Sequence, residues 1–330
     1  MMTIAKRILF TQLIQAFLGL VYCLPILAIA APYPERSIKW IVPYPPGGTT
    51  DVVARNVAQN MSEQLGQPIV IENKPGAGGQ IAINYVAKAP ADGYTLLVSD
   101  ASLATVQSLY KSLPFNPQTD LSAVSLFVTV PHVVVVNPAL KVNTLGELIK
   151  LNKQQTEKMV FSSGGLGSPL HLAGESLKLA TGLDWLHVPY KGAGPAIFAV
   201  VSNEAQIATP SLPAVLAQIQ AKKLDVLAIM GDKRSPSLPT VPTVLELGYP
   251  KATAIGWVGL HAPAGVDAEV MTKLANVSKQ ALKSPQLQGR LQEQGATIST
   301  DLSSSDYAKF VATQSAHWNQ VVKAAGIQAE

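Results

Sequence analysis

Cysteine is nearly absent from this chain of 330 residues, and the one cysteine present, Cys23, lies in an apolar N-terminal run. A single cysteine cannot form an intrachain disulfide, and without that run the chain has no thiol for catalysis or for a metal site. Aromatic residues make up 6% of the chain and charged residues 14%, whereas glycine and proline number 24 each. This composition is typical of a packed globular protein with many turns, and it excludes a disordered or coiled-coil chain.

The chain carries only a small excess of positive charge. The formal net charge is +4, and removing the two positive charges of Lys6 and Arg7 leaves +2. So small a surplus gives no electrostatic argument for nucleic acid, and no nucleic-acid partner is expected. The length predicts about two domains, each large enough to bury its own core.

The first thirty residues form a separate segment. Lys6 and Arg7 precede an acid-free apolar run, 8–27, and the small-residue site Ala28-Ile29-Ala30 follows it. A charged start, an apolar run and an A-x-A site are the three parts of a secretory signal peptide. The pattern therefore predicts a signal peptide from Met1 to Ala30 and an exported mature chain.

Two alternatives apply to the same segment. The run approaches the length that spans a membrane, so a transmembrane anchor is possible, although Gln12, Gln15 and Pro25 interrupt the run. Lipidation of Cys23 is the other alternative, but Tyr22 stands where a small residue is required. Cleavage after Ala30 is the favoured interpretation.

Strands and helices alternate along the rest of the chain. Apolar runs rich in β-branched residues predict strands, and helical spacing of apolar residues predicts helices between them. Near-continuous apolar strands alternating with helices predict an α/β fold of mostly parallel sheets flanked by helices. The predicted strands are 38–42, 68–72, 94–98, 133–136, 159–162, 185–188, 206–209 and 226–230.

The chain changes character after Trp257, where the helical patterns have no strands of their own. Such late helices are predicted to pack back onto the first half of the fold. The expected organisation is lobe 1 at 31–130 plus 257–330 and lobe 2 at 131–256, with a ligand cleft between the lobes. The two crossings, near 125–133 and 256–262, form the expected hinge.

Two Gly-rich turns each lie between an apolar strand and an amphipathic helix. The first is Pro-Tyr-Pro-Pro-Gly-Gly-Thr-Thr-Asp at 43–51, and the second is Ser-Ser-Gly-Gly-Leu-Gly-Ser-Pro at 162–169. Such a turn directs backbone N–H groups and the positive end of a helix dipole at one point, where an anion fits. Two turns in separate halves predict a small anionic ligand held between two lobes.

Motifs throughout the chain resemble one family. The first are Tyr-Pro-x-Arg-x-Ile at 33–38 and Val-Pro-Tyr-Pro-Pro-Gly-Gly-x-x-Asp at 42–51. The others, in order, are Glu-Asn-Lys-Pro-Gly-Ala-Gly-Gly at 72–79, Asp-Gly-Tyr-Thr-Leu at 92–96, His-Leu-Ala-Gly-Glu at 171–175, His-Val-Pro-Tyr-Lys-Gly at 187–192, Lys-Arg-Ser-Pro at 233–236, Val-Pro-Thr at 241–243 and Ala-Pro-Ala-Gly at 262–265. Together they resemble the Bug family of periplasmic solute-binding proteins, the receptors of tripartite tricarboxylate transporters.

The resemblance implies a two-lobed periplasmic-binding-protein fold, the Venus flytrap, that closes on a small organic carboxylate. It also implies a periplasmic location, membrane permease subunits as partners, and two Gly-rich loops that grip one carboxylate, partly through ordered water. A monomer without a cofactor is expected. An alternative is a ligand-sensing receptor that reports to a sensor kinase of a two-component system.

The two turns supply most of the predicted ligand-binding residues. Backbone N–H groups and hydroxyls are expected to donate to the carboxylate oxygens. The first turn contributes Tyr44, Pro46, Gly47, Gly48, Thr49 and Thr50, and the second contributes Ser162, Ser163, Gly165, Gly167 and Ser168.

Several further positions have two interpretations each. Asp51 would repel a carboxylate, so it either stabilises the first helical turn or pairs with an ammonium or a bridging water. His171 and Tyr190 either contact the ligand or serve packing, and Lys191 either attracts the anion or is simply solvated. We include Asp51, His171 and Tyr190 in the predicted site.

The sequence departs from the family at the predicted walls of the cleft. The stretch 208–213 lacks the acidic residue that usually precedes the family's Leu-Pro-Ser-like turn, and 100–105 lacks the usual Asn-Pro. Ser99, Ser102, Thr209 and Ser211 are the expected wall residues. The far end of the ligand is therefore expected to differ from those of named relatives.

An enzyme acting on a small carboxylate is the remaining alternative. Neither turn carries the Gly-Lys-Ser/Thr of phosphate-transfer loops, the dinucleotide G-x-G-x-x-G is absent, and no G-x-S-x-G surrounds Ser162. The five histidines show no metal-ligand spacing. We therefore predict binding without turnover, and no catalytic or metal-ligating residues.

Overall fold

The computed structural model describes residues 33–110, 112–293 and 295–327. The chain divides into a unit Met1–Glu35 and a unit Arg36–Glu330, and the described helices and strands belong to the second unit. The predicted signal peptide, its cleavage site and Cys23 lie outside the described residues. No helix within the described residues is long and apolar enough to cross a membrane.

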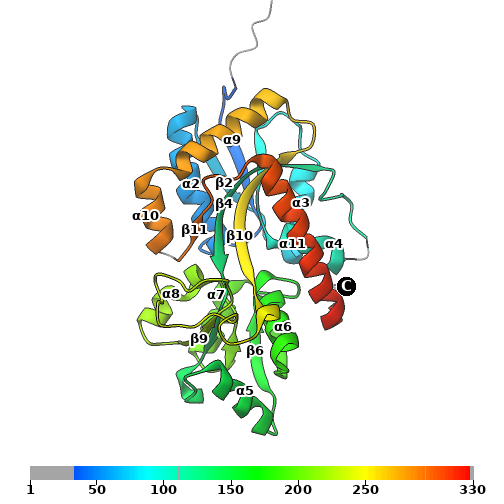
Figure 1. The fold of residues 1–330 in the computed structure, drawn as a ribbon. Coiled ribbons are helices and arrows are strands. Elements are labelled where there is room, and N and C mark those ends of the chain that lie inside the picture. The colour runs from blue at the N-terminus through cyan, green and yellow to red at the C-terminus, as the bar shows by residue number, and fades with distance from the viewer. Residues whose placement is uncertain (1–32, 111, 294, 328–330) are drawn as a thin grey trace, which may run out of the picture. The chain divides into compact units, whose positions relative to one another are not determined.

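Two sheets organise this unit (Figure 1). The first has six strands in the order β11-β4-β10-β3-β1-β2, and the second has five in the order β7-β6-β8-β5-β9. The strands of the first sheet are β1 Ile38–Val42, β2 Ile69–Asn73, β3 Thr95–Asp100, β4 Leu121–Pro131, β10 Ile255–Pro263 and β11 Thr297–Ile298. Those of the second are β5 Val133–Val136, β6 Met159–Ser163, β7 Trp185–Pro189, β8 Ile207–Ala208 and β9 Asp225–Ile229.

Most strands of each sheet point the same way, as predicted, but both sheets are mixed because β10, β11 and β5 run against their neighbours. In the first sheet β1 pairs in parallel with β2 and β3, whereas β10 runs antiparallel to both β3 and β4. In the second sheet β6 pairs in parallel with β7 and β8, and β5 runs antiparallel to β8 and β9. Burial on both faces gives the same apolar run whichever way a strand points, so strand direction could not be read from the pattern.

Helices flank each sheet, which confirms the two-lobed α/β fold. The first sheet with its helices is called the first lobe below, and the second sheet with its helices the second lobe. The first lobe contains α2 Thr49–Leu65, α3 Gln80–Ala87, α4 Ala101–Leu109, α9 Ala268–Leu282, α10 Pro285–Glu293 and α11 Ser304–Ala325. The second contains α5 Leu145–Gln154, α6 Pro169–Thr181, α7 Ala193–Val201 and α8 Leu212–Gln220, and short 3-10 turns lie at Ala77–Gly79, Pro138–Leu140 and Pro250–Ala252.

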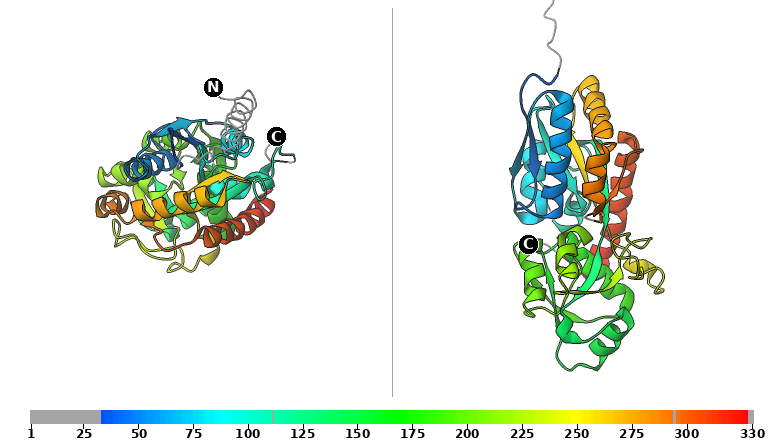
Figure 2. Two further views of the ribbon diagram at one scale, coloured as in Figure 1. Left: turned by 90° about the horizontal axis from the view of Figure 1, so that it is seen from above. Right: turned by 90° about the vertical axis from the view of Figure 1, so that its left-hand side faces the viewer.

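The late helices pack onto the first lobe, as predicted. Helices α9 and α10 contact α2, and α11 contacts α4 and β4 (Figure 2). Trp257 of β10 meets Tyr307 and Phe310 of α11 edge to face, with ring centroids 5.7 and 5.9 Å apart. These contacts tie the end of the chain to the sheet formed by its beginning.

The two lobes are joined by strands that pass from one sheet to the other. Strand β4 ends at Pro131 and β5 begins at Val133, so His132 alone separates the two sheets on this crossing. The chain returns between β9 and β10. The predicted lobe boundaries, 130/131 and 256/257, divide the chain near these crossings, and we retain them as a proposal.

Candidate functional site

A cavity of about 270 Å³ is lined by residues of both lobes. Its volume lies near the lower end for small-molecule sites, which suits a ligand on the order of ten non-hydrogen atoms. The first lobe contributes Tyr44, Pro45, Pro46, Gly47, Gly48, Thr49, Thr50, Asp100, Ala101, Val130, Gly256, Trp257 and Val258. The second lobe and the crossing contribute His132, Gly164, Ser168, Pro169, Leu170, Lys191, Gly192, Ala193, Gly194, Pro195, Ile197, Ser211 and Ala214.

Five helices begin at this cavity. The first residue of α2, α4, α6 and α7, or the residue just before it, lines the cavity, and so does Ser211, which precedes α8. Asp100 and Ser168 cap α4 and α6 with their side chains, whereas α2, α7 and α8 have no side-chain cap. The first N–H groups of a helix have no partner within it, and the helix dipole is positive there. Three uncapped helix starts therefore face one small volume.

Two of these helix starts meet directly. Thr49 Oγ1, at the first residue of α2, lies 2.8 Å from Ser211 Oγ, just before α8. The contact joins the first lobe to the second, because α2 packs on the first sheet and α8 belongs to the second. Since Ser211 bonds Thr49, its hydroxyl does not cap its own helix. The positive ends of α2 and α8 thus converge beside the cavity.

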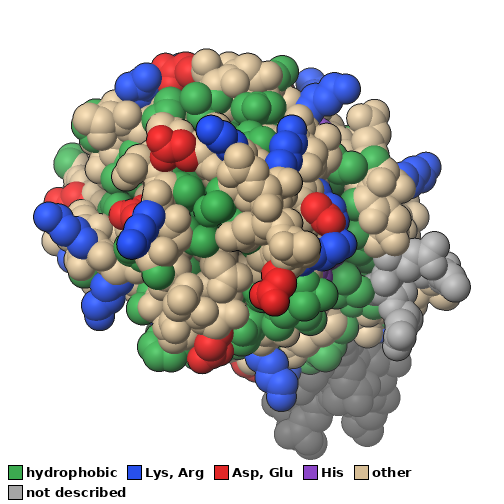
Figure 3. Space-filling model, turned by 90° about the horizontal axis from the view of Figure 1, so that it is seen from below, with side chains coloured by type: hydrophobic (Ala, Val, Ile, Leu, Met, Phe, Trp, Pro, Cys, Tyr) green, Lys and Arg blue, Asp and Glu red, His purple; other side chains and the backbone are tan. Residues whose placement is uncertain are grey.

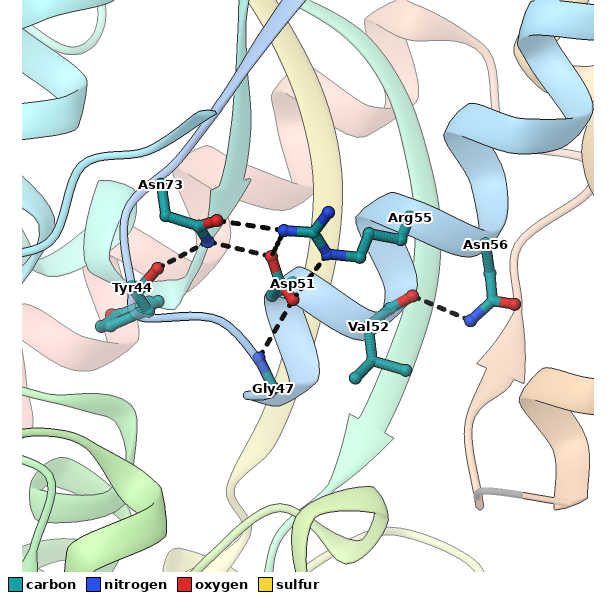
Figure 4. A network of polar contacts seen from close by, with 7 residues as sticks. All are labelled: Tyr44, Gly47, Asp51, Val52, Arg55, Asn56 and Asn73. Carbon is teal, nitrogen blue, oxygen red and sulfur yellow. Dashed lines mark hydrogen bonds and ion pairs between the residues drawn. The ribbon is translucent and has the colours of Figure 1, made fainter. Parts of the chain in front are cut away.

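Asp51 fixes the first Gly-rich turn and is committed to protein partners (Figure 4). It accepts hydrogen bonds from the Gly47 N–H at 3.0 Å, from Arg55 at 2.9 Å and from Asn73 at 2.9 Å. Burial acts to raise the pKa of Asp51, but the bonds from Arg55, Gly47 and Asn73 outweigh it and lower the pKa below the usual 3.8. Asp51 is absent from the cavity lining, and the geometry favours its helix-stabilising interpretation.

Asp100 is a carboxylate in the cavity wall, and the sequence did not single it out as a ligand residue. Its side chain accepts from the Ser102 N–H at 2.9 Å, from Ser102 Oγ at 2.6 Å and from Thr50 Oγ1 at 3.0 Å. Burial raises the pKa of Asp100 above its usual value. No lysine or arginine among the described residues forms an ion pair with it.

His132 is another titratable group that lines the cavity and was not among the predicted site residues. Its Nδ1 lies 2.6 Å from the carbonyl oxygen of Thr209, so Nδ1 carries the hydrogen and donates. Burial lowers the pKa of His132 to about 4, so the ring is neutral near pH 7 and its Nε2 is an acceptor. A polar residue between two apolar strands, at 132, was the signal available in the sequence.

The polar groups of the second Gly-rich turn are mostly hydrogen-bonded to other groups of the second lobe. Ser162 Oγ donates to the Ala196 carbonyl at 2.8 Å, and Ser163 Oγ lies 2.6 Å from His187 Nε2. The Gly167 N–H donates to His171 Nδ1 at 3.0 Å, and Ser168 Oγ accepts from the His171 N–H at 3.3 Å. Within this turn Gly164, Ser168 and Pro169 line the cavity.

A neighbouring turn, Lys191–Pro195 at the start of α7, takes the larger share of this wall, since all five of its residues line the cavity. Gly164 packs beneath it: a Cβ added to Gly164 would lie 3.1 Å from the Gly192 carbonyl carbon and 3.2 Å from the Ala193 nitrogen. The second Gly-rich turn therefore supports the Lys191–Pro195 turn by close backbone contact. Glycines before an apolar helix, Gly192 and Gly194, were the available signal.

His171 belongs to a buried aromatic group in the second lobe. Its ring stacks on His187 with centroids 4.0 Å apart, and its Nε2 lies 3.9 Å from Glu175 Oε1. Burial, with the nearby charges of His187 and Lys178, lowers the pKa of His171 to about 3. The His171–Glu175 pair is consequently not an ion pair at neutral pH.

The remaining predicted residues fall into two groups. Ser99, Ser102, Tyr190 and Thr209 do not line the cavity. Ser99 Oγ lies 2.7 Å from His261 Nδ1 and 2.9 Å from the Tyr307 hydroxyl, and Thr209 Oγ1 donates to the Leu170 carbonyl. The predicted residues that the structure brings to the cavity are Tyr44, Pro46, Gly47, Gly48, Thr49, Thr50, Ser168 and Ser211. Those it places outside are Asp51, Ser99, Ser102, Ser162, Ser163, Gly165, Gly167, His171, Tyr190 and Thr209.

Neither a metal centre nor a charge patch stands out. The described residues contain no group of three or more His, Cys, Asp or Glu side chains placed to hold a metal ion. On the face seen in Figure 3, basic and acidic side chains are interspersed, and neither sign gathers into a patch. The convergent helix starts and the buried carboxylate of Asp100 are therefore electrostatic features of the cavity itself.

Known proteins are similar to this chain over most of its length. A family model described as the tripartite tricarboxylate transporter family receptor matches residues 53–327. The chain is 40% identical over 306 residues to protein BugT of Bordetella pertussis, covering 90% of this chain and 93% of BugT.

Solved structures agree with these sequence matches. Rpa4515 of R. palustris, solved with adipate, is 33% identical with a TM-score of 0.86 and covers 90% of this chain and 100% of its own. MatC of Rhodopseudomonas palustris, solved with bound malate, is 30% identical with a TM-score of 0.82 and covers 88% and 100%. The two-lobed fold predicted for this chain is thus the fold of these proteins.

Proposed function

This chain belongs to the tripartite tricarboxylate transporter receptor family, and from that membership we propose that it captures one small organic carboxylate in the cavity between its lobes. The observation that carries the proposal is the convergence of two uncapped helix starts at Thr49 and Ser211, 2.8 Å apart. Backbone N–H groups and hydroxyls placed there donate to carboxylate oxygens. Charge-assisted bonds of this kind contribute roughly 1.5–3 kcal/mol each.

Two similar proteins support the choice of ligand chemistry. Rpa4515 was solved with adipate and MatC with malate, and both ligands are carboxylates. The donors at the helix starts suit the group that these ligands share. A few such bonds in a closed site reach about 8 kcal/mol, which corresponds to micromolar affinity.

Binding without turnover is part of the proposal. Among the described lining residues, Thr50 Oγ1 donates to Asp100, but that carboxylate is already held by Ser102 at the start of α4. Ser211 bonds Thr49, Ser168 accepts from a backbone N–H, and His132 donates to a backbone carbonyl, so none of these groups pairs a hydroxyl with a free base. Acyl or phosphoryl transfer needs a nucleophile activated by such a base. A cavity with donors and no activated nucleophile suits capture and release.

Export and delivery to a transporter complete the proposal. Residues 1–30 act as a signal peptide that directs the chain to the periplasm, and the loaded receptor passes its ligand to membrane permease subunits. Uptake of the bound acid by cells should then require this chain. A sensor role would instead leave uptake intact and abolish a transcriptional response to the acid.

Thermal unfolding with a panel of organic acids tests the capture step. A ligand at 100 times its Kd stabilises the folded state by about 2.7 kcal/mol, so at least one acid should raise Tm by several degrees. Calorimetry should then give one site per chain with a micromolar Kd, and no product should form. Stabilisation by a sugar or an inorganic ion, with no effect of any carboxylate, would contradict the proposal.

A further inference from the structure

Hydroxyl groups of the two lobes come together beside the cavity. The starts of α2 and α8 meet at Thr49 and Ser211, and the proposed function seats one carboxylate there. The inference rests on that proposed function and concerns the rest of the ligand. The walls that would surround the rest of the ligand consist mainly of apolar side chains.

The floor of the cavity is a strip of the paired strands β4 and β10. Val130 lies directly opposite Gly256 in the register, and Gly256 and Val258 point to the same face because side chains alternate along a strand. Trp257 lies between them and turns its ring to the other face, toward Tyr307. The floor is thus formed by two valine side chains and a bare glycine backbone.

Gly256 leaves space that a side chain would fill. A Cβ added there would lie 3.1 Å from Val130 Cγ2 and 3.2 Å from His132 Nε2. The lack of a side chain keeps a flat surface open between these two residues. A planar or extended apolar group fits such a surface without displacing a protein side chain.

The side walls continue the apolar lining, with Pro46 in the first lobe and Leu170, Pro195, Ile197 and Ala214 in the second. Burying an apolar group against such walls removes apolar surface from water, which favours binding. Away from the helix starts and Lys191, a charged group against these walls would instead lose its hydration without gaining a partner. The walls therefore favour an uncharged ligand body.

Two charged side chains line the cavity among the described residues, Asp100 and Lys191. Lys191 is exposed, so water and salt screen its charge. Asp100 is 4% exposed, and burial raises its pKa. Its two oxygens accept hydrogen bonds from Ser102 and Thr50, which act in the opposite direction and stabilise the ionised form. A second carboxylate in this volume would meet a buried charge of its own sign.

We propose that the cavity selects a monocarboxylate whose remaining body is apolar and uncharged, with that body lying over Gly256 between Val130 and Val258. The carboxylate binds where α2 and α8 begin. Asp100 acts as a specificity residue because it disfavours a second carboxylate. His132 Nε2 contributes a neutral acceptor beside the floor.

Matched pairs of acids test this selection on the unaltered mature protein. Calorimetry would compare hexanoate with adipate and benzoate with terephthalate, since each pair differs by one carboxylate. We expect the monocarboxylate of at least one pair to bind ten or more times tighter than its partner. Equal or tighter binding of both dicarboxylates would overturn the inference.

Other outcomes separate this inference from the proposed function. If malate binds and none of the four probes does, the selection for an apolar monocarboxylate is wrong while carboxylate capture stands. If no acid of any kind binds, the proposed function itself fails. Both results come from the same titration series.

Two variants locate the selection in the structure. Asp100→Asn keeps an acceptor for the Ser102 N–H and removes the charge, so the ratio of hexanoate to adipate affinity should fall about tenfold or more. Gly256→Ala fills the floor, so benzoate should lose more affinity than hexanoate. An unchanged ratio in a folded Asp100→Asn protein would show that Asp100 does not determine the selection. Equal losses of benzoate and hexanoate affinity in Gly256→Ala would show that the ligand body does not lie over the floor.

Discussion

Buried neutral histidines are the residues most sensitive to solution conditions. Burial lowers the pKa of His171 and of His261 to about 3 and that of His132 to about 4. An unfolded histidine titrates near 6.5. Below that pH the unfolded chain binds protons that the folded chain does not, so the free energy of unfolding falls as the pH falls.

The first residue-scale prediction concerns this pH dependence. Between about pH 6.5 and 4, each of the three histidines should reduce the free energy of unfolding by roughly 1.4 kcal/mol per pH unit. His261→Gln should cost stability at pH 7 through the lost contact with Ser99, yet reduce the slope by about that amount. Urea unfolding at several pH values measures both. An identical slope in the variant would show that His261 is already charged in the folded state.

Residue roles were only partly predictable from the sequence. Small residues at helix starts, such as Gly48 and Thr49, are informative because the turn and the helix dipole act locally. The hydrogen-bond partners of Asp51 could not be predicted. Asn73 is 22 positions away and reaches Asp51 only through the pairing of β1 with β2. Asp100 was missed as a lining residue because its capping role looks ordinary in sequence.

At the scale of elements, the contact between α2 and α8 links the lobes. Thr49 and Ser211 belong to different lobes, so their hydroxyls can bond only while the lobes are close. A hydrogen bond of this kind contributes about 0.5–1.5 kcal/mol. The contact should therefore favour the closed arrangement and strengthen ligand binding.

A double-mutant cycle with Thr49→Val and Ser211→Ala measures that contribution. Each single variant should weaken ligand binding, and the double variant should lose less binding free energy than the sum of the two single losses, because both remove the same bond.

Cysteines introduced at the exposed positions Lys153 on α5 and Glu269 on α9 could carry distance labels, and the distance between the labels should increase in the variants. Thr272→Val, whose hydroxyl bonds within α9, is the matched control. Strictly additive losses would contradict the shared bond.

Elements were predictable where local chemistry defines them. The strand at 38–42 has the predicted bounds, and those at 159–162 and 185–188 extend one residue further, because β-branched apolar runs define strands locally. The direction of the strands and the place of the α7 start in the cavity could not be predicted from local sequence, because both depend on the folded structure. The Lys191–Pro195 turn has its place in the cavity because Gly164 lets its backbone approach β6, a contact between residues far apart in sequence.

At the scale of the whole molecule, two lobes meet around one small cavity. The late helices complete the first lobe, and the crossings at His132 and before β10 join it to the second. The family motifs predicted this arrangement because they extend from 33 to 265, through both lobes. They did not predict the ligand's body, which depends on side chains from several elements that pack together only in the fold.

The most direct test of carboxylate capture is a calorimetric titration of Gly48→Val with the acid that most stabilises the unaltered protein. Gly48 has φ −76° and only one atom within 4 Å of an added Cβ, so valine fits the backbone but projects at the cavity lining. Gly289→Val on α10, where nothing lies within 4 Å of an added Cβ, is the matched control. The account predicts at least a hundredfold loss of affinity in Gly48→Val at an unchanged Tm of the free protein, with the control near the unaltered Kd. Full affinity in Gly48→Val would show that the ligand does not bind where α2 begins.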